Sequence, residues 1–382
     1  MSEMSYLEKL LDGVEVEWVT LGSMADIGTG SSNRQDESEN GIYPFYVRSK
    51  NILKSDTFEF DEVAIVIPGE GGIGDIFHYV EGKYALHQRA YRIRITTNAV
   101  DTKFLYYFMS SSFKQYILTK SVGATAISIR KPMLEGFKVP IPSPDNPEKS
   151  LAIQSEIVRI LDKFTALTAE LTAELTAELT MRKNQYNYYR DQLLSFKEGE
   201  VEWKTLGEVA VIGTGNHDTQ DAIEHGKYIF YARGREPLKL NVFDFDETAI
   251  ITAGDGAGVG KVFHYAKGKY ALHQRAYRIV PNAFMNPRFV YHYITAYFFT
   301  YIQKASVSSS VTSLRRPMFL KFPIPVPPSE EQARIVEILD KFDTLTNSIT
   351  EGLPREIELR QKQYEYYRDL LFSFPRPETA SN

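Results

Sequence analysis

The chain has 382 residues, 43% of them hydrophobic and 24% charged, with a formal net charge of −5 and no cysteine. This length is enough for two or three domains with sizeable cores, and the composition excludes a disordered or fibrous protein. The absence of cysteine excludes a disulfide framework, a thiolate metal site and a cysteine nucleophile. No signal-peptide pattern and no apolar run near the roughly 18–20 residues of a membrane span occur, so we expect a cytoplasmic protein with no membrane partner.

The sequence contains one unit written twice. GKYALHQRAYRI occurs unchanged at 82–93 and 268–279, and ILDKF at 160–164 recurs at 338–342. The offset is about 185 residues in the first part of each copy and 178 in the second. A period of this length indicates a duplicated unit of domain size and excludes a short-period solenoid.

Residues 1–13 form a short stub ahead of the first copy. Its YLEKLL segment at 6–11 matches the pattern of YRDQLL at 189–194, and both precede an EVEW segment. The stub therefore looks like the end of a helical region whose body lies at the C-terminus. We expect a circular order of units, with the two chain ends meeting in space.

Residues 14–145 are rich in Tyr, Phe, Val, Ile and Gly. Runs such as VAIVIPGEGGIG are typical of strands separated by glycine turns, whereas residues 104–118 have helical spacing. The closing proline cluster, VPIPSPDNP, excludes helix and predicts an extended linker. Residues 198–328 repeat this pattern, so both segments are predicted to be mixed α and β.

Residues 146–197 are predicted to be helical, with Asn146 as a cap and Pro147 at the first helical position. Three TAEL units at 168–179 place leucine at every fourth position. Because four residues exceed one helical turn of 3.6, this apolar stripe drifts around the helix.

Residues 329–382 are predicted to form the second helical region, opened by a Ser329–Gln332 capping box and broken at residues 351–354. A generic amphipathic helix would explain either apolar stripe alone, but two matched stripes of equal length favour an antiparallel helix pair. The residues expected to pack between the helices are Ile157, Leu161, Phe164, Leu167, Leu171, Leu175, Leu179, Ile335, Leu339, Phe342, Leu345, Ile349, Leu353 and Ile357.

Patterns for catalysis and cofactor binding fail in context. GEGGIG at 69–74 satisfies a dinucleotide-binding pattern, but a strand-like segment follows it where a helix is required. ADIGTG at 25–30 resembles a loop that binds S-adenosylmethionine, yet Val211 replaces Asp26 in the second copy and no Asn/Asp-Pro-Pro-aromatic tetrapeptide occurs. A nucleophile elbow, a phosphate-binding lysine loop and an HExxH motif are also absent. We therefore expect no enzyme active site.

The histidines are predicted to be structural. His87 and His273 lie in identical LHQRAY runs, at the expected junction of a strand and a turn. No carboxylate or third histidine stands at a ligand spacing near them, so no metal site is predicted.

Basic residues recur at matching places in the two copies. SIRKP and SLRRP each follow a run of small and hydroxyl residues, which suits a loop that contacts phosphate, although a solvated charge pair would look the same. Other cations follow aromatic pairs or lie in loops that differ between the copies, as expected of two similar scaffolds that read different half-sites. The candidate DNA-binding residues are Arg34, Arg48, Lys50, Lys54, Ser128, Arg130, Lys131, Arg233, Arg235, Lys239, Ser313, Arg315 and Arg316.

Taken together, these segments resemble the specificity subunits of Type I restriction–modification systems over essentially the whole chain. The resemblance rests on IGTG, LHQRAYRI, the IPIP-type linker into IVRILDKF, the TAEL run and QYNYYRDQLLSF. It implies an α+β fold in which two mixed α/β target recognition domains are joined by two long helical regions, paired as an antiparallel coiled coil in a pseudo-two-fold circular arrangement. The expected domains are the stub 1–13, recognition domains 14–145 and 198–328, and helical spacer regions 146–197 and 329–382.

The resemblance also implies a non-catalytic function. Each recognition domain would read one half of a split, asymmetric double-stranded DNA target, while the helices set the gap and dock two modification (methyltransferase) subunits. Adenine methylation with S-adenosylmethionine would belong to those partners, as would ATP and Mg use if restriction subunits are present; this chain is expected to bind no cofactor. The alternative is a non-catalytic scaffold or adhesion-type protein that dimerises through its helices.

The negative charge is unevenly distributed along the chain. Residues 14–145 carry a net charge of −2, residues 200–328 carry +4, and the stub and helices carry the remaining −7. The overall acidity therefore does not exclude DNA as a partner. It predicts that tight DNA binding also needs the charge of the partner subunits.

Overall fold

The computed structural model describes residues 6–120, 128–197, 199–305, 313–348 and 350–376. The chain forms two compact units, one made of Met1–Ala173 with Glu358–Asn382 and the other of Glu174–Ile357. Each unit thus contains one α/β domain and parts of both helical regions.

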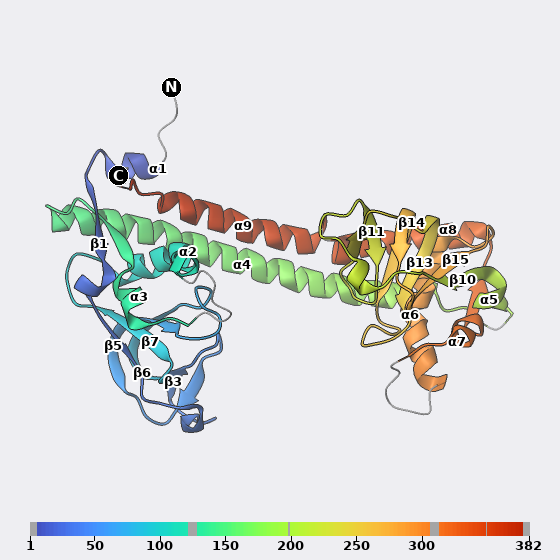
Figure 1. Cartoon of the computed structure of the whole chain (residues 1–382), viewed down its shortest axis with the longest axis horizontal. Helices are drawn as coiled ribbons and strands as arrows, with labels where there is room; N and C mark the ends of the chain where they lie inside the picture. Colours follow the sequence, from blue (N-terminus) through green and yellow to red (C-terminus); the bar gives the residue numbers. More distant parts are fainter. Residues whose placement is uncertain (1–5, 121–127, 198, 306–312, 349, 377–382) are drawn as a thin grey trace. The chain divides into compact units, whose positions relative to one another are not determined.

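The α/β domain of the first unit is built on a six-stranded sheet (Figure 1) with the spatial order β2-β7-β5-β6-β3-β4. Neighbouring strands are antiparallel except β3 and β6, which run parallel. The strands are β2 (Ala25–Thr29), β3 (Tyr43–Tyr46), β4 (Leu53–Ser55), β5 (Phe60–Pro68), β6 (His78–Leu86) and β7 (Ala90–Ile95).

The continuous apolar run of β5 is explained by burial on both faces of the sheet. Ile65 and Ile67 belong to the large core beneath helix α2 (Thr102–Lys120), whereas Val66 belongs to a second cluster with Tyr84 on the opposite face. Side chains alternate between faces along a strand, so a strand covered on both sides has no polar face.

The proline cluster that was expected to be a linker is instead a paired strand. Strand β8 (Lys138–Pro142) pairs antiparallel with β1 (Val16–Thr20), and Ser143 donates its backbone N–H to the carbonyl of Glu15 at 2.8 Å. Pro140 and Pro142 alternate with the residues that bond to β1, so the N–H groups they lack would point away from the partner strand. The prediction of extended backbone is confirmed, but the prediction of a linker is wrong.

The second unit repeats this domain with the spatial order β10-β15-β13-β14-β11-β12, the same connectivity as in the first. Its strands are β9 (Glu202–Thr205), β10 (Ala210–Thr214), β11 (Tyr228–Tyr231), β12 (Leu238–Leu240), β13 (Phe245–Ala253), β14 (Phe263–Leu272), β15 (Ala276–Pro281) and β16 (Pro323–Val326). The short helices of the two domains are η1 (Leu21–Ser23), η2 (Arg34–Asp36), α3 (Lys131–Glu135), α5 (Leu206–Val209), η3 (Thr219–Asp221) and α7 (Arg316–Leu320), and α6 (Pro287–Ala305) corresponds to α2. The prediction of two similar mixed α/β domains is confirmed.

Three helices form the helical regions: α4 (Pro147–Leu193), α8 (Ser329–Asn347) and α9 (Leu353–Leu371). Asn146 caps α4 as expected, because its side-chain oxygen accepts the backbone N–H of Lys149 at 3.1 Å. The predicted break between α8 and α9 is also confirmed. Gly352 has φ +84°, a conformation that favours glycine, and an added Cβ would lie 2.5 Å from the carbonyl oxygen of Thr344.

The predicted capping box at the start of α8 is wrong. Pro328 occupies the N-cap position, and the side chain of Gln332 turns inward, where its amide donates to the carbonyl groups of Phe284 and Pro327. Gln154 occupies the same place in α4, donating to the carbonyl of Ala99 at 3.0 Å. Both glutamines are fully buried, so each joins the start of its helix to its own α/β domain.

An aspartate eight residues later, about two turns of helix, makes a second attachment in each unit. Asp162 accepts hydrogen bonds from Lys103 and Tyr107 on α2, at 2.8 and 2.7 Å. Asp340 is bonded in the same way to Arg288 and to buried His292 on α6, at 2.6 and 2.7 Å.

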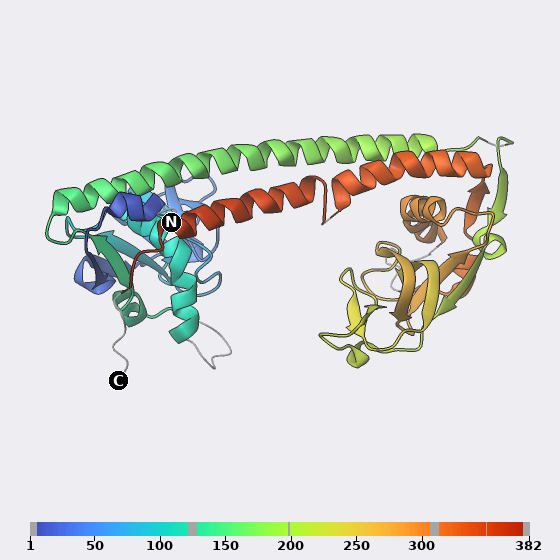
Figure 2. The same cartoon turned by 90° about the horizontal axis from the view of Figure 1, so that it is seen from above.

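The helical regions pack antiparallel within each unit, and α9 runs beside α4 in Figure 1 and Figure 2. Aromatic rings contribute contacts between the helical regions in both units. Phe164 and Tyr367 have ring centroids 5.7 Å apart in the first unit, and Phe342 stacks on Tyr189 at 5.6 Å in the second. The hydroxyl groups of Thr165 and Tyr364 lie 3.0 Å apart. The expected antiparallel pairing is therefore confirmed, with both phenylalanines of the predicted stripe taking part.

Other members of the predicted stripe pack differently. Ile157 and Leu161 are buried in the core of the first α/β domain, and Ile335 and Leu339 in that of the second, so these four pack against domains and not between helices. Leu167 is 52% exposed, and its predicted packing is wrong. The buried face of α4 follows steps of three and four residues, from Leu161 to Phe164 and then to Thr168. Successive residues are about 100° apart around a helix, so Leu167 points away from this face. Half-buried positions are Leu171, Leu175, Leu179, Leu345, Leu353 and Ile357, and Ile349 lies outside the described residues.

The described segments next to the two chain ends meet in the first unit, as expected from the stub. Leu7 and Leu11 of helix α1 (Tyr6–Leu11) share a core with Phe372 and Phe374, and α1 lies beside the end of α9 in Figure 1. The indole N–H of Trp18 donates to the carbonyl of Pro375 at 2.8 Å. In the second unit, Leu194 at the end of α4 occupies the equivalent place in the core. The circular order of units is therefore confirmed at the chain ends.

Candidate nucleic-acid interface

All thirteen candidate DNA-binding residues are exposed. Arg48 follows strand β3 and Arg233 follows β11, so both stand at the carboxyl end of the equivalent strand. Arg130 and Arg315 are the N-cap residues of α3 and α7, and Lys131 and Arg316 open those helices. Of the small and hydroxyl runs before these helices, Ser128 and Ser313 are described, and the predictions for residues 121–127 and 306–312 lie outside the described residues.

In the first domain, three charged side chains form a cluster, which we call the first clamp: Arg48, Glu70 and Arg89. One carboxylate oxygen of Glu70 accepts hydrogen bonds from both guanidinium groups, at 3.0 Å from Arg48 and 3.1 Å from Arg89. Arg48 follows β3 and Arg89 follows β6, and these strands are parallel. Because parallel strands end at the same edge of a sheet, residues 41 positions apart meet there.

The second domain contains the equivalent second clamp: Arg233, Asp255 and Arg275. Arg233 donates to one carboxylate oxygen of Asp255 at 2.9 Å, and Arg275 donates to the other at 3.1 Å. Burial acts to raise the pKa of Asp255, but the hydrogen bonds from the two arginines outweigh it and hold that pKa below its usual range. An aspartate thus serves here where the first domain has a glutamate.

Each clamp is joined to the segment before α3 or α7. Glu70 forms a backbone bridge with Ser128, and Asp255 forms one with Ser313. The structure therefore brings together two groups of candidates that are far apart in the sequence: the arginine after the aromatic pair and the serine of the SIRKP or SLRRP segment. A hollow of about 480 Å³ lies beside the first clamp and includes Arg34. Its counterpart, about 460 Å³, includes Arg235.

Other candidates lie apart from the clamps. Lys54 and Lys239 are on β4 and β12, the short edge strands of the two sheets. The side-chain Nζ of Lys131 lies 3.9 Å from the carboxylate oxygen Oε1 of Glu135 on its own helix. No contact among the described residues joins these lysines, or Lys50, to a clamp.

Sequence reasoning missed four members of the clamps: Glu70, Arg89, Asp255 and Arg275. A signal was present, because an acidic residue stands second in both glycine turns, GEGG and GDGAG, and an arginine stands in both LHQRAY runs. The pairing itself was hidden, since it depends on which strands are neighbours in the sheet.

The two histidines of the LHQRAY runs support the clamp backbone, in agreement with the structural function predicted for them. The ring Nδ1 of His87 accepts the backbone N–H of Arg89 at 3.0 Å, and His273 accepts that of Arg275 at 2.9 Å. Burial lowers the pKa of His87, and the neighbouring guanidinium groups of Arg48 and Arg89 lower it further. The neutral ring can therefore act as the acceptor at neutral pH.

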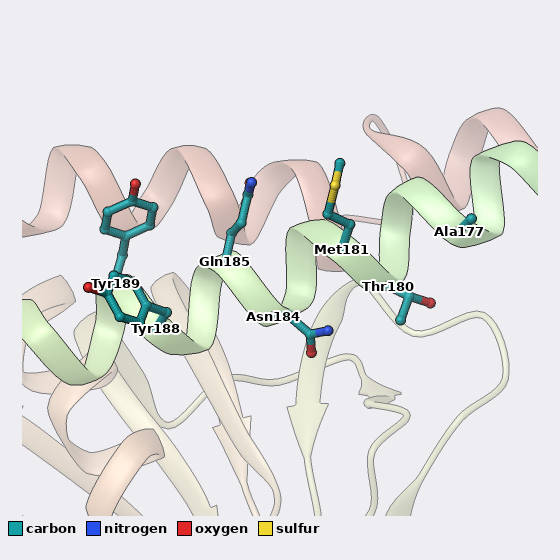
Figure 3. Close-up of a pocket in the computed structure, with 7 residues that line it drawn as sticks. All are labelled: Ala177, Thr180, Met181, Asn184, Gln185, Tyr188 and Tyr189. Carbon is teal, nitrogen blue, oxygen red and sulfur yellow. The ribbon is translucent and has the colours of Figure 1, made fainter.

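A different surface occurs on the helical regions. Tyr188 and Tyr366, from the matching QYNYYRD and QYEYYRD segments, are both 62% exposed. In Figure 3 the rings of Tyr188 and Tyr189 lie next to each other on α4, and their centroids are 5.4 Å apart. These tyrosines and Met181 line a hollow of about 640 Å³. Exposed aromatic side chains of this kind are typical of protein-binding surfaces.

Among the described residues, no three His, Asp or Glu side chains are placed to hold a metal ion. In the same part of the chain, no helix is long and apolar enough to span a membrane.

Comparison with known proteins identifies the family. The family model described as "Type I restriction modification DNA specificity domain" matches residues 13–181 and again residues 198–359. The chain belongs to this family. The specificity subunit of the Escherichia coli Type I restriction enzyme EcoR124I/EcoR124II is 41% identical, with all of both chains covered. The E. coli EcoprrI specificity subunit is 37% identical over 92% of this chain and 93% of that protein.

Solved structures from Type I systems share the fold. The S subunit of a Type I system from M. genitalium has a TM-score of 0.54 at 18% identity, covering 98% of this chain and 100% of that one. A second chain, from a study of complex assembly and conformational transition of the Type I system, has a TM-score of 0.60 at 14% identity, covering 94% of this chain and 98% of that one. The family match and the 41% identical relative confirm the expectation of a non-catalytic specificity subunit.

Proposed function

We propose that this chain is the DNA sequence-recognition subunit of a Type I restriction–modification complex, and that each α/β domain reads one half of a split, asymmetric target. One observation carries the proposal. The chain is a member of the specificity family, and its two domains share one topology and have matched clusters of exposed cations at the same strand ends. Exposed arginine and lysine contact phosphates, and loops that differ between the domains read base edges. We place the recognition domains at residues 14–145 and 198–328.

The helical regions, residues 146–197 and 329–382, supply the spacing and the docking surfaces in this proposal. The matching exposed tyrosines at 188 and 366 give one equivalent surface to each unit, which favours two modification subunits. S-adenosylmethionine would then be used by those subunits, and ATP and Mg²⁺ by restriction subunits where the system has them. Such a complex acts on chromosomal DNA, so we place it in the cytoplasm.

Methylation mapping of host DNA, with and without this gene, tests the proposal. We expect a single split motif, two specified halves separated by an unspecified gap, whose methylation depends on the gene. A scaffold that only dimerises through its helices would leave the methylation pattern unchanged. Duplex DNA binding that weakens with salt, and that a methyltransferase subunit strengthens, would separate the two functions in purified protein.

Substitution of the exposed tyrosines tests the docking surfaces. Tyr188→Ala and Tyr366→Ala should each weaken capture of one modification subunit, and the double variant should lose both, as measured by mass photometry of the assembled complex. Tyr6→Ala, which removes an exposed tyrosine from α1, is the matched control. Undiminished assembly in the double variant would contradict docking at these surfaces.

A further inference from the structure

We propose that the two clamps are phosphate-binding sites, each of which contacts the sugar–phosphate backbone at the equivalent point of its half-site. This assignment rests on the proposed function. It adds that Arg89 and Arg275 contact the DNA phosphates. It distinguishes residues that hold the DNA in register from those that read its sequence.

The two domains preserve the clamp while their surroundings change. LHQRAY is identical in both, and the glycine turns GEGGIG and GDGAGVG differ in length and sequence yet keep one carboxylate at the clamp. The aspartate reaches both arginines with its two oxygens, whereas the glutamate uses one. A feature shared by two domains cannot distinguish two different half-sites. It suits the part of DNA that is the same everywhere, which is the phosphate backbone.

The charge and geometry of the clamps also suit an anion. Two guanidinium groups face one carboxylate, so each clamp has an excess positive charge. Within the part of the chain that the structure describes, each arginine is bonded through one terminal nitrogen, and the other donors of its planar fork are available for a phosphate oxygen. The side chains of Arg89 and Arg275 are 57% and 64% exposed, so a DNA strand can reach them.

The carboxylate and the histidine orient the arginines before DNA arrives. The backbone N–H of His87 donates to the carbonyl of Tyr46 at 2.9 Å, and its ring Nδ1 accepts the backbone N–H of Arg89. His273 makes the same pair of bonds to Tyr231 and Arg275. The arginine backbone is therefore tied to the sheet, and the carboxylate keeps the two guanidinium groups side by side. Less conformational freedom is then lost when the phosphate binds.

The test uses the full chain assembled with its methyltransferase partner and a duplex carrying the target found by methylation mapping. We measure binding by fluorescence anisotropy from about 50 to 200 mM KCl. Each phosphate contact contributes about 0.9 to the slope of log affinity against log salt concentration. Arg89→Ala and Arg275→Ala should each reduce the slope by about 0.9, and the double variant by about 1.8. Across this range, the affinity advantage of the wild type over a single variant should fall about 3.5-fold.

Two controls follow. The first tests whether the effect comes from a loss of structure at the clamp, and the second tests whether it comes from a general loss of positive charge. Arg89→Lys keeps the positive charge and should restore most of the slope. Arg94→Val removes an arginine of similar exposure from the same domain and installs the residue that the second domain has, Val280; it should leave the slope unchanged. Thermal denaturation of every variant confirms that it is folded.

Each contrary result overturns the assignment. An unchanged slope in the Arg89→Ala, Arg275→Ala double variant refutes phosphate binding by the clamps. An equal loss of slope in Arg94→Val shows a general charge effect. If Arg89→Ala alters the methylated motif in one half-site, the arginine reads a base and not a phosphate. Absence of duplex binding by the wild-type complex refutes the proposed function itself, and the clamp assignment with it.

Discussion

Removing the ring of Phe372 tests whether the C-terminal tail completes the core of the first unit. This side chain is 7% exposed, and its ring centroid lies 5.6 Å from that of Phe104 and 5.5 Å from that of Phe108 on α2. Both contacts are edge-to-face, the arrangement that aromatic pairs prefer. Phe372→Ala therefore removes buried apolar area and two ring contacts, and leaves a cavity between α2 and the tail.

A Phe→Ala substitution in a packed core costs about 3–5 kcal/mol. For a domain of about 150–250 residues, each kcal/mol lowers Tm by about 2–4 °C, so the first unit should unfold about 6–20 °C earlier. Differential scanning calorimetry of the full chain measures this change. Leu194→Ala, at the equivalent place in the second unit, should lower the other transition and so assigns the two.

Tyr366→Ala is the matched control for Phe372→Ala, since it removes an exposed ring six residues earlier, from the end of α9 just before the tail. Exposed substitutions of this kind change stability by no more than about 0.5 kcal/mol. If Phe372→Ala unfolds within about 2 °C of the wild type, the tail does not contribute to the core and the circular closure of the fold would be in doubt.

Three further predictions concern spacing, binding and pH. Deleting one TAEL unit, residues 176–179, shortens α4 by about 6 Å and should narrow the gap of the methylated motif by about one or two base pairs, with both halves unchanged. Arg315→Ala with Arg316→Ala should weaken DNA binding similarly for all sequences and reduce its salt dependence, measured by anisotropy. Burial acts to raise the pKa of Asp340, but hydrogen bonds from His292 and Arg288 outweigh it, so the folded-state pKa is lowered and the carboxylate stabilises the fold above its ordinary pKa of about 4. Asp340→Asn should therefore lower Tm at pH 7, and this difference should shrink as the pH falls through that depressed pKa.

Each of these predictions has a clear contrary result. Altered half-sites with an unchanged gap would refute the spacing function of the TAEL units. A changed sequence preference with an intact salt slope would show that Arg315 and Arg316 read bases. A Tm difference for Asp340→Asn that is as large at pH 3 as at pH 7 would show that the charge of the carboxylate is not what stabilises the helix attachment.

The repeated sequence made the architecture predictable. Because the two copies share their apolar patterns, one topology had to serve both, and the match between the stub and the end of the first helical region correctly placed the chain ends together. The cap at Asn146 and the break at Gly352 were predictable as well, since both depend on local backbone chemistry.

What a helix face packs against could not be predicted from spacing alone. Ile157 and Leu161 have the same 3.6-residue periodicity whether they meet a second helix or the domain beside them. The clamps were hidden for a related reason, because Arg48 and Arg89 meet only through the parallel pairing of β3 with β6. Strand neighbours are a property of the whole sheet, whereas spacing is a property of a short segment.

The contact between Trp18 and Pro375 spans 357 residues of sequence, and this separation has a consequence for biosynthesis. A ribosome adds roughly 5–20 residues per second, so about 20–70 s pass between the synthesis of the first strand and that of the tail that covers it. The core of the second α/β domain also includes Ile335 and Leu339 of α8, which are made before the tail, so this domain can finish folding first. The usual order, in which the N-terminal domain is completed before the next emerges, is reversed. The rings of Phe104 and Phe108 on α2 therefore lack their contacts with Phe372 on the nascent chain until the tail has been made.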